Sequence, residues 1–372
     1  MDANNPFRAH LTPEQIELLE TMGPGLDQLA QLQTAMLAGK MSPEGNRLSV
    51  DPTPPAPGQI HPMPGEAARA RGLEALRRGE VASVILNGGM ATRFGGVVKG
   101  VVPVDGSRSF LALKILDALR VAQIADAAPP PIVLMNSKAT QAATLEHLKA
   151  NDWFGYPEDK IWCFEQQWAV RLTPEGKIFK DAEGEPSFYG PGHGDLATCI
   201  KRSGILDRFI AGGGRCLMMS NVDNVVATLD PALIGWHLSG DQQITVEVVE
   251  KFEGDAGGAP AVVDGHLQIV EGFRFPTGFD QDLIPVFNTN TLWFDAEALA
   301  SAPALTWFMV NKKVEGAPVV QYERLVGQMT AFLPTAFVQV PRVGMETRFV
   351  PVKSPEDLER QRAQLLTAWG CR

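Results

Sequence analysis

The sequence predicts an α/β protein with a mixed, mainly parallel central sheet that helices cover on both faces. Runs of consecutive apolar residues at 81–86, 131–135 and 215–219 have the length of strands, and segments with helical periodicity separate them. Strands that are apolar throughout are typical of parallel sheets, because such sheets are buried on both sides. Beyond residue 240 the strands follow one another more closely, which indicates antiparallel pairing in that half.

The first 65 residues are expected to form a helical segment followed by an extended strap. Thr12-Pro13-Glu14-Gln15 matches a capping box with proline at the first helical position, and Gly23-Pro24-Gly25 ends that helix. A second helix is expected to reach about Lys40. Residues 51–65 contain six prolines, a composition that favours an extended chain over helix or strand.

Residues 66–372 are predicted to form one larger domain. Its first half, to about residue 240, is expected to have helices at 66–78, 109–123 and 138–149 between the apolar strands. Its second half, about 241–353, is expected to have strands at 244–249, 260–263 and 266–270, with Asp264-Gly265 as a hairpin turn. A helix at 354–369 is predicted to end the chain.

Composition restricts the class of protein. The net charge is −10 and no stripe of lysine and arginine is present, so we expect no nucleic-acid partner. No run approaches the roughly 18 apolar residues that a membrane span needs, and no secretory signal is visible, so we expect no membrane partner and a cytoplasmic location. The cysteines lie far apart without a C-x-x-C pair, which indicates reduced thiols instead of a zinc site or disulfides: Cys163, Cys199, Cys216 and Cys371.

A glycine-rich loop after the strand at 81–86 indicates nucleotide chemistry. Gly88 and Gly89 would let backbone N–H groups approach a phosphate or a base, and the cations Arg93 and Lys99 would balance its charge. The spacing fits neither a P-loop nor the dinucleotide fingerprint. The alternative is a tight turn with a purely structural role.

Two further loops carry candidate functional side chains. Asp223 follows an apolar strand at the carboxyl edge of the predicted sheet, where a carboxylate can hold Mg²⁺ together with nucleotide phosphates. The alternative for Asp223 is a turn residue between Asn221 and Asn224. His193, in Pro191-Gly192-His193-Gly194-Asp195, is presented by a tightly turned backbone, which favours contact with a ligand over an ordinary loop role.

No Ser-His-Asp or Cys-His constellation stands out in the sequence. That pattern agrees with nucleotidyl transfer, in which the attacking group is already an anion and catalysis depends on positioning and charge neutralisation.

Eight segments occur in an order that is shared with one enzyme family: Leu86-Asn87-Gly88-Gly89 with Lys99, Leu134-Met135-Asn136-Ser137, Pro191-Gly192-His193-Gly194-Asp195, Ser220-Asn221-Val222-Asp223-Asn224, Gly257-Gly258, Phe287-Asn288-Thr289-Asn290-Thr291-Leu292-Trp293, Val310-Asn311-Lys312-Lys313 and Arg348-Phe349-Val350-Pro351-Val352-Lys353. Together they span about residues 80–360. In these segments the chain resembles the UTP–glucose-1-phosphate uridylyltransferases, or UDP-glucose pyrophosphorylases, of the eukaryotic-like type.

The resemblance implies a GT-A-like, Rossmann-type nucleotidyltransferase fold that converts UTP and glucose 1-phosphate to UDP-glucose and pyrophosphate. Residues 66–372 would then be the catalytic domain, with a nucleotide half to about 240 and a sugar-side half at about 241–353. Eukaryotic relatives continue into a carboxyl-terminal β-helix. The resemblance covers about residues 80–360 and does not include that β-helix.

The resemblance also implies a set of substrate-binding residues: Leu86, Asn87, Gly88, Gly89, Gln166, Gly192, His193, Asn221, Gly258, Asn288 and Asn290. Gly88 and Gly89 would line the base and ribose, and Gln166 would read the edge of uracil. Gly192 and His193 would lie near the uridine and the sugar phosphate.

In the sugar-side half, Asn290 and Asn288 would contact the hexose. Asp223 would carry Mg²⁺, and Lys313 would bind the phosphates beside the reacting centre. Lys99, Lys313, Arg93 and the metal would offset the repulsion between two anions in the catalytic step.

The sequence departs from the family pattern at three positions. Ala91 replaces the usual glycine, Val98 replaces the usual proline before Lys99, and Lys312 replaces the usual proline before Lys313. Two rival functions stay open on the sequence: a pyrophosphorylase for N-acetylhexosamine 1-phosphate or for several sugars, and a catalytically silent sensor of nucleotide sugars. The asparagine-rich segment at 287–293 favours glucose, and the retained charged residues favour an enzyme.

Overall fold

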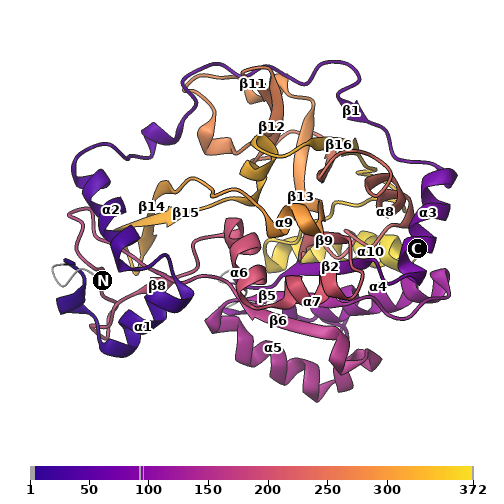
Figure 1. The fold of residues 1–372 in the computed structure, drawn as a ribbon, viewed down its shortest axis with the longest axis horizontal. Helices are drawn as coiled ribbons and strands as arrows, with labels where there is room; N and C mark the ends of the chain where they lie inside the picture. Colours follow the sequence, from indigo (N-terminus) through magenta and orange to yellow (C-terminus); the bar gives the residue numbers. More distant parts are fainter. Residues whose placement is uncertain (1–4, 92–93, 95, 371–372) are drawn as a thin grey trace.

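The computed structural model describes residues 5–91, 94 and 96–370, and a central sheet carries its fold (Figure 1). The described strands of this eight-stranded sheet lie in the order β1 (Ile60–His61), β16 (Thr335–Gln339), β10 (Ile244–Glu250), β13 (Val286–Asp295), β9 (Cys216–Asn221), β2 (Val81–Leu86), β5 (Ile132–Asn136) and β6 (Ile161–Glu165). The predicted strand at 81–86 is confirmed with the same bounds.

Most neighbours in this sheet are parallel. β2 pairs in parallel with β5 and β9, and β5 pairs in parallel with β6. β13 lies antiparallel between β9 and β10, so the prediction of a mixed, mainly parallel sheet is confirmed. Because β2, β5, β6 and β9 run in one direction, the loops that follow them meet at the same edge of the sheet.

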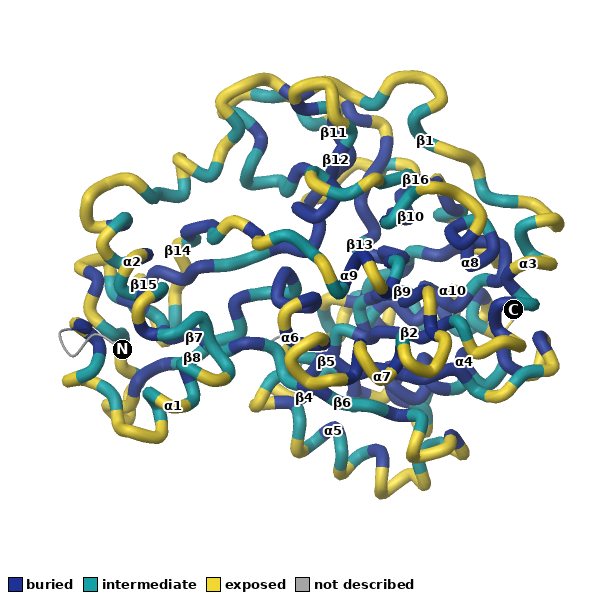
Figure 2. Tube along the Cα trace, in the orientation of Figure 1, coloured by how far each residue is buried: buried dark blue, intermediate teal, exposed yellow. Residues whose placement is uncertain are grey.

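Helices cover both faces of the sheet, as the apolar strands predict. One hydrophobic core contains residues of α3 (Glu66–Arg77), α4 (Phe110–Ala125), α5 (Lys138–Ala150), α8 (Pro231–His237) and α10 (Pro355–Gly370). The second core contains residues of α6 (Leu196–Arg202), α7 (Ile205–Ala211) and α9 (Ala296–Ala300). Figure 2 shows the buried chain concentrated in the strands between these layers, with exposed residues on the outer helices and loops.

The amino-terminal segment forms two helices, α1 (Pro13–Met22) and α2 (Leu26–Leu37). The capping box predicted at Thr12 and Gln15 is confirmed. These helices share a small hydrophobic core with four strands: β7 (Ala169–Val170), β8 (Phe188–Tyr189), β14 (Phe308–Val314) and β15 (Ala317–Glu323). The segment therefore covers the end of the molecule that carries these strands (Figure 1).

The proline-rich strap runs from α2 toward β1 and passes β11 (Ala259–Val263) and β12 (His266–Val270) (Figure 1). Thr53 in the strap forms a β-bridge with Val262. β11 and β12 form the predicted hairpin, in which Asp264 and Gly265 have φ of 51° and 79°, as a tight two-residue turn requires.

Among the described cysteines, Cys199 and Cys216 are buried and Cys163 is partly buried, and all three are free thiols. Burial raises the pKa of the Cys163 thiol to about 11. Cys371 lies outside the described residues. The described part of the chain has no helix that is both long and apolar enough to cross a membrane.

Candidate active site

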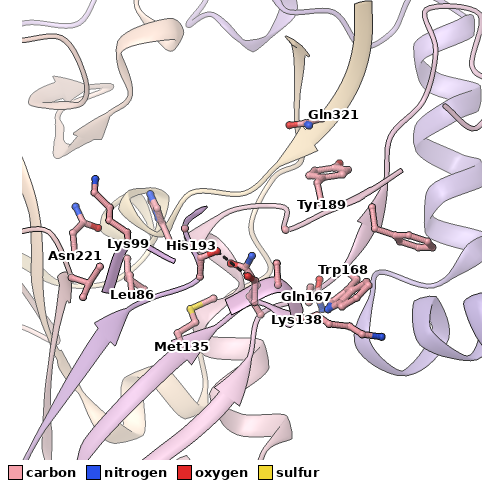
Figure 3. Close-up of a pocket in the computed structure, with 18 of the residues that line it drawn as sticks. Leu86, Lys99, Met135, Lys138, Gln167, Trp168, Tyr189, His193, Asn221 and Gln321 are labelled. Atoms are coloured by element: carbon pink, nitrogen blue, oxygen red, sulfur yellow. Dashed lines mark hydrogen bonds between the residues drawn. The ribbon is translucent and has the colours of Figure 1, made fainter. Parts of the chain in front are cut away.

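A cavity of about 680 Å³ opens where the loops after β2, β5, β6 and β9 meet. Residues predicted to bind substrate, to carry the metal or to act in catalysis line it: Leu86, Gly88, Gly89, Lys99, Gln166, His193, Asn221 and Asp223. The other predicted substrate-binding residues do not line it: Asn87, Gly192, Gly258, Asn288 and Asn290. Figure 3 shows Lys99 and Asn221 at one end of the cavity and Trp168, Tyr189 and Gln321 at the other. Its volume is in the range of small-molecule sites.

Gly88 and Gly190 leave room for the side chain of Gln166. A Cβ atom at Gly190 would lie 1.8 Å from Gln166 Nε2, and one at Gly88 would lie 3.0 Å from Gln166 Oε1. The Gln166 backbone N–H donates to the Asn136 carbonyl at 2.8 Å, and the Ser137 hydroxyl donates to the Gly88 carbonyl at 2.9 Å. The glycine loop and the end of β6 therefore present one polar amide side chain to the cavity.

Asn87 lies beneath the glycine loop and does not line the cavity. Its Nδ2 donates to Asn136 Oδ1 at 2.7 Å and to Thr144 Oγ1 at 2.9 Å. Gly100 leaves room for it, since a Cβ atom there would lie 2.2 Å from Asn87 Oδ1. Asn87 thus fixes the loop from below, which is a positioning role.

Lys99 and Asp223 form an ion pair at the edge of the cavity. Their side chains are 18% and 13% exposed, so the pair is largely shielded from bulk water. No group of three or more described His, Cys, Asp and Glu side chains could hold a metal ion. Arg93, the other cation predicted in this loop, lies outside the described residues.

A buried lysine clamps the loop that carries Asp223. Lys114 Nζ donates to Ser220 Oγ at 2.9 Å and to the Ala227 carbonyl at 2.6 Å, and so joins the two ends of this loop. Burial lowers the pKa of Lys114 to about 7, and the neighbouring Asp117 carboxylate opposes that shift. The position of Asp223 is therefore set from the core side of the sheet.

A second buried ion pair supports the same loop. Arg348 donates from Nε and Nη2 to the two carboxylate oxygens of Glu247, each at 2.7 Å, and from Nη2 to the Thr228 carbonyl at 2.9 Å. Trp293 Nε1 also donates to Glu247, at 2.9 Å. Burial opposes the charge on Arg348, but the Glu247 carboxylate holds the pKa of the guanidinium above its usual value.

His193 is a neutral hydrogen-bond donor in the cavity. Its Nδ1 accepts the Val326 backbone N–H at 3.1 Å, which places the ring proton on Nε2. Burial lowers the pKa of His193 to about 4, so the ring stays neutral near pH 7. The loop at 191–195 therefore supplies one N–H donor without a charge.

The same loop is fixed by Arg324. A Cβ atom at Gly192, where φ is +100°, would lie 2.7 Å from the Arg324 carbonyl oxygen, and one at Gly194 would lie 2.4 Å from its carbonyl carbon. The Gly194 N–H donates to that carbonyl at 2.9 Å. The Arg324 guanidinium contacts Asp195, which is fully buried, and Gln167, which lines the cavity. Burial raises the pKa of Asp195 to about 6, against the effect of the Arg324 charge.

On the sugar side, a bulge in β13 brings Asn290, which does not itself line the cavity, to a residue that does. The register with β10 shifts between Glu247 and Val248, which leaves residues 289–290 unpaired. Asn290 has a φ of +57°, a left-handed conformation that asparagine tolerates better than most residues. Its Nδ2 donates to Oδ1 of the cavity-lining Asn221 at 3.0 Å.

Polar groups continue behind Asn290 into the sugar-side half. Asn288 Oδ1 accepts the Asn290 N–H at 3.0 Å, and the Asn288 N–H donates to the Gly258 carbonyl at 3.1 Å. A Cβ atom at Gly258 would lie 3.1 Å from a carboxylate oxygen of Glu271, a residue that we did not predict. Burial raises the pKa of Glu271 to about 7, and Arg274 opposes the shift. No local sequence pattern marks Glu271, because it comes to this place only through the hairpin of β11 and β12.

Lys313 is not brought to the cavity. It lies on β14, is exposed, and pairs with Pro318 near the tip of the hairpin of β14 and β15. Its neighbour Lys312 forms an ion pair with Glu323 at 3.5 Å. Gln321, on the same hairpin, does line the cavity.

The rest of the cavity lining consists of residues outside our predicted site: Met135, Ser137, Lys138, Ala139, Gln167, Trp168, Arg171, Phe188, Tyr189, Gly190, Val222 and Gln321. Lys138 Nζ lies 4.7 Å from the Trp168 ring centroid, and the Trp168 and Phe188 rings are 5.6 Å apart. The Trp168 backbone N–H donates to the Met22 carbonyl at 2.9 Å, so α1 supports this part of the lining from outside.

Comparison with known proteins places this site in a family context. A family model for UTP–glucose-1-phosphate uridylyltransferase matches residues 63–368. The UTP–glucose-1-phosphate uridylyltransferases of Encephalitozoon cuniculi and Solanum tuberosum are 29% and 30% identical over 80% and 76% of this chain. The chain spans only about 60% of the length of these curated relatives, 60% and 61% respectively.

Solved structures show the same fold. The UDP-N-acetylglucosamine pyrophosphorylase of Trypanosoma brucei, in complex with an inhibitor, superimposes with a TM-score of 0.79 at 18% identity, covering 94% of this chain and 77% of its own. The V402W mutant of UDP-glucose pyrophosphorylase from Leishmania major superimposes with a TM-score of 0.73 at 23% identity, covering 90% and 74%. At these identities the likeness establishes the nucleotidyltransferase fold alone.

Proposed function

This chain belongs to the UTP–glucose-1-phosphate uridylyltransferase family, and we propose that it converts UTP and glucose 1-phosphate to UDP-glucose and pyrophosphate. The observation that carries the proposal is that the glycine loop, Gln166, His193 and the pair of Lys99 and Asp223 converge on one cavity. The cavity thus combines a polar group for a base, a neutral donor, and charged groups for phosphates.

The proposed step needs no protein nucleophile. An oxygen of the sugar phosphate attacks the α-phosphorus of UTP and forms a new P–O bond, while the bond from that phosphorus to the bridging oxygen breaks. Pyrophosphate leaves with the electron pair. Lys99 would offset the repulsion between the two anions, and His193 Nε2–H would donate to an oxygen in the cavity.

The residues around Asp223 fit Mg²⁺. Mg²⁺ commonly takes one or two protein carboxylates and completes its shell with phosphate oxygens and water, and Asp223 offers one carboxylate at the cavity edge. The metal, when bound, would neutralise phosphate charge. We propose that Lys99, which neutralises Asp223 in this structure, turns to phosphate when the metal takes its place.

Glucose 1-phosphate is the sugar phosphate that we propose, because the curated relatives at 29% and 30% identity act on it by name. Asn290 is the side chain proposed to contact the hexose, with Asn288 behind it, since the hydrogen bond of Asn290 to Asn221 connects Asn290 to the cavity. Lys313 would reach the phosphates only after movement of its hairpin.

The partners in this proposal are small molecules. The lack of a nucleic-acid partner stays a prediction from the net charge of −10. The lack of a membrane partner and the cytoplasmic location stay predictions from the absence of a long apolar run and of a visible secretory signal.

The test is pyrophosphate release by purified protein with Mg²⁺ and UTP. Parallel reactions contain the 1-phosphates of glucose, galactose, N-acetylglucosamine and N-acetylgalactosamine. We expect release with glucose 1-phosphate alone. Release with several sugars would make the protein a broad-range pyrophosphorylase, and UTP binding without any release would leave a silent nucleotide-binding protein.

A further inference from the structure

A second pocket, of about 430 Å³, lies behind the loop that carries His193. Gly194 and Arg324 line this pocket, whereas His193 and Gln167 line the cavity of the candidate active site. The Arg324 guanidinium contacts Gln167 and Asp195. The Arg324 side chain therefore connects the linings of the two spaces.

The charge of this second pocket is unbalanced. Lys201, Arg202 and Arg324 line it, and its described lining includes no acidic residue. Asp195, outside that lining, balances the charge of Arg324, so the excess charge is that of Lys201 and Arg202. A third pocket, of about 450 Å³, is lined by three arginines but also by three acidic residues, so its charges can balance. In a chain with a net charge of −10, a local excess of positive charge in a pocket favours the binding of an anion there.

The rim of the second pocket is one face of α6. Thr198, Lys201 and Arg202 are three and four residues apart, a spacing that places their side chains together on a helix. In the part of the chain that the structure describes, Lys201 and Arg202 form no ion pair. They donate instead to the carbonyls of Ala300 and Thr21, at 2.8 and 3.1 Å.

The lining of the pocket also contains apolar side chains, among them Leu299, Leu305 and Met329. α6 and α9 lie side by side at this place (Figure 1). Two cations and a hydroxyl match the charge and donor needs of a dianionic phosphate group, and the apolar side chains suit a carbon skeleton. We propose that this pocket binds a small organic phosphate monoester.

Arg324 couples the pocket to the candidate active site. Its Nε is buried and has no hydrogen-bond partner among the described residues, and its guanidinium carbon lies 4.1 Å from the Trp307 ring centroid. A phosphate in the pocket would compete with Asp195 and Gln167 for this guanidinium. Since the Arg324 backbone holds Gly194, occupancy of the pocket would shift the loop that presents His193, an effect that rests on the proposed function.

The binding test uses calorimetry on the full chain saturated with UDP-glucose, so that the active-site cavity is filled. Glucose 6-phosphate, which is not the proposed substrate, is titrated, with glucose and inorganic phosphate as comparison ligands. We expect one site for glucose 6-phosphate, weaker binding of inorganic phosphate, and none of glucose. The double variant Lys201→Glu/Arg202→Glu should bind roughly tenfold or more weakly.

Lys149→Glu is the matched control, because Lys149 is exposed in the last turn of α5 and does not line the pocket. Lys201→Gln/Arg202→Gln serves if the charge reversal unfolds the protein. Absence of binding, equal binding by the double variant, or equal affinity for inorganic phosphate would each overturn the proposal. The cations would then serve only the carboxyl end of α6, where they suit the helix dipole.

The coupling is tested on UTP. We expect saturating glucose 6-phosphate to change the UTP dissociation constant about fivefold or more, and Arg324→Lys to retain glucose 6-phosphate binding but lose the change. An unchanged constant in the wild type would refute the coupling. Because this readout is binding, it remains valid even if no pyrophosphate is released, so the two proposals fail separately.

Discussion

Replacing Asp223 by asparagine keeps the shape of the side chain and removes its charge. If Asp223 balances Lys99 in the resting site and carries the metal during turnover, the variant should lose transition-state stabilisation worth about 3–4 kcal/mol, or roughly 10²–10³ in kcat. The loss should fall mainly on kcat, because the charge is needed where the phosphates react.

The cost to folding should be much smaller. Breaking a fully buried ion pair costs about 3–5 kcal/mol, and a surface pair contributes about 0–1 kcal/mol. Lys99 and Asp223 are 18% and 13% exposed and face the cavity, so the freed ammonium can be hydrated. We therefore expect Asp223→Asn to lower the free energy of unfolding by about 1–2 kcal/mol. An unfolding entropy of about 0.8 kcal/mol/K for this length converts that cost to about 1–3 °C in Tm.

Pyrophosphate release and thermal unfolding measure the two effects on the same preparation. Lys99→Met and the double variant complete a double-mutant cycle. If Lys99 and Asp223 act together in catalysis, the double variant should turn over no more slowly than the slower single variant. Near-normal turnover of Asp223→Asn would refute the role in catalysis. A fall in Tm of roughly 10 °C would instead make Asp223 a structural residue.

Three further predictions concern the surroundings of the cavity. Glycine tolerates the left-handed backbone at position 290 and alanine does not, so urea unfolding should show Asn290→Ala to be about 1 kcal/mol less stable than Asn290→Gly. Both variants lose the hydrogen bond to Asn221 and should raise the KM for glucose 1-phosphate. Burial raises the pKa of Glu271 to about 7, so the stability that its protonated form contributes is fully present below about pH 4.5 and is lost as the pH rises through 7. Urea midpoints measured over a pH series should show this loss, and Glu271→Gln should reduce it. Gly194→Ala should force the Arg324 backbone away, at a cost of about 1–3 kcal/mol, and an unchanged midpoint and kcat would contradict that tight packing.

Local patterns predicted much of the first half of the fold. The strand at 81–86 and the helix of α3 were visible because an apolar run and helical periodicity are properties of neighbouring residues. The strands β6 and β16 were missed. β6 mixes buried with partly buried positions, and β16 combines two buried residues with partly buried and exposed ones, so neither shows a clean period. β13 was noticed only as a motif, since its bulge interrupts the alternation.

The sequence by itself determined which loops hold the chemistry, because glycines after β2 and an acid after β9 are local consequences of strands that end at one sheet edge. Tertiary structure alone decided which side chains meet. Lys99 and Asp223 are 124 residues apart, Asp195 and Arg324 are 129 apart, and Asn221 and Asn290 are 69 apart. Such contacts depend on strand order and register, which the packing of the whole sheet fixes and no short segment encodes.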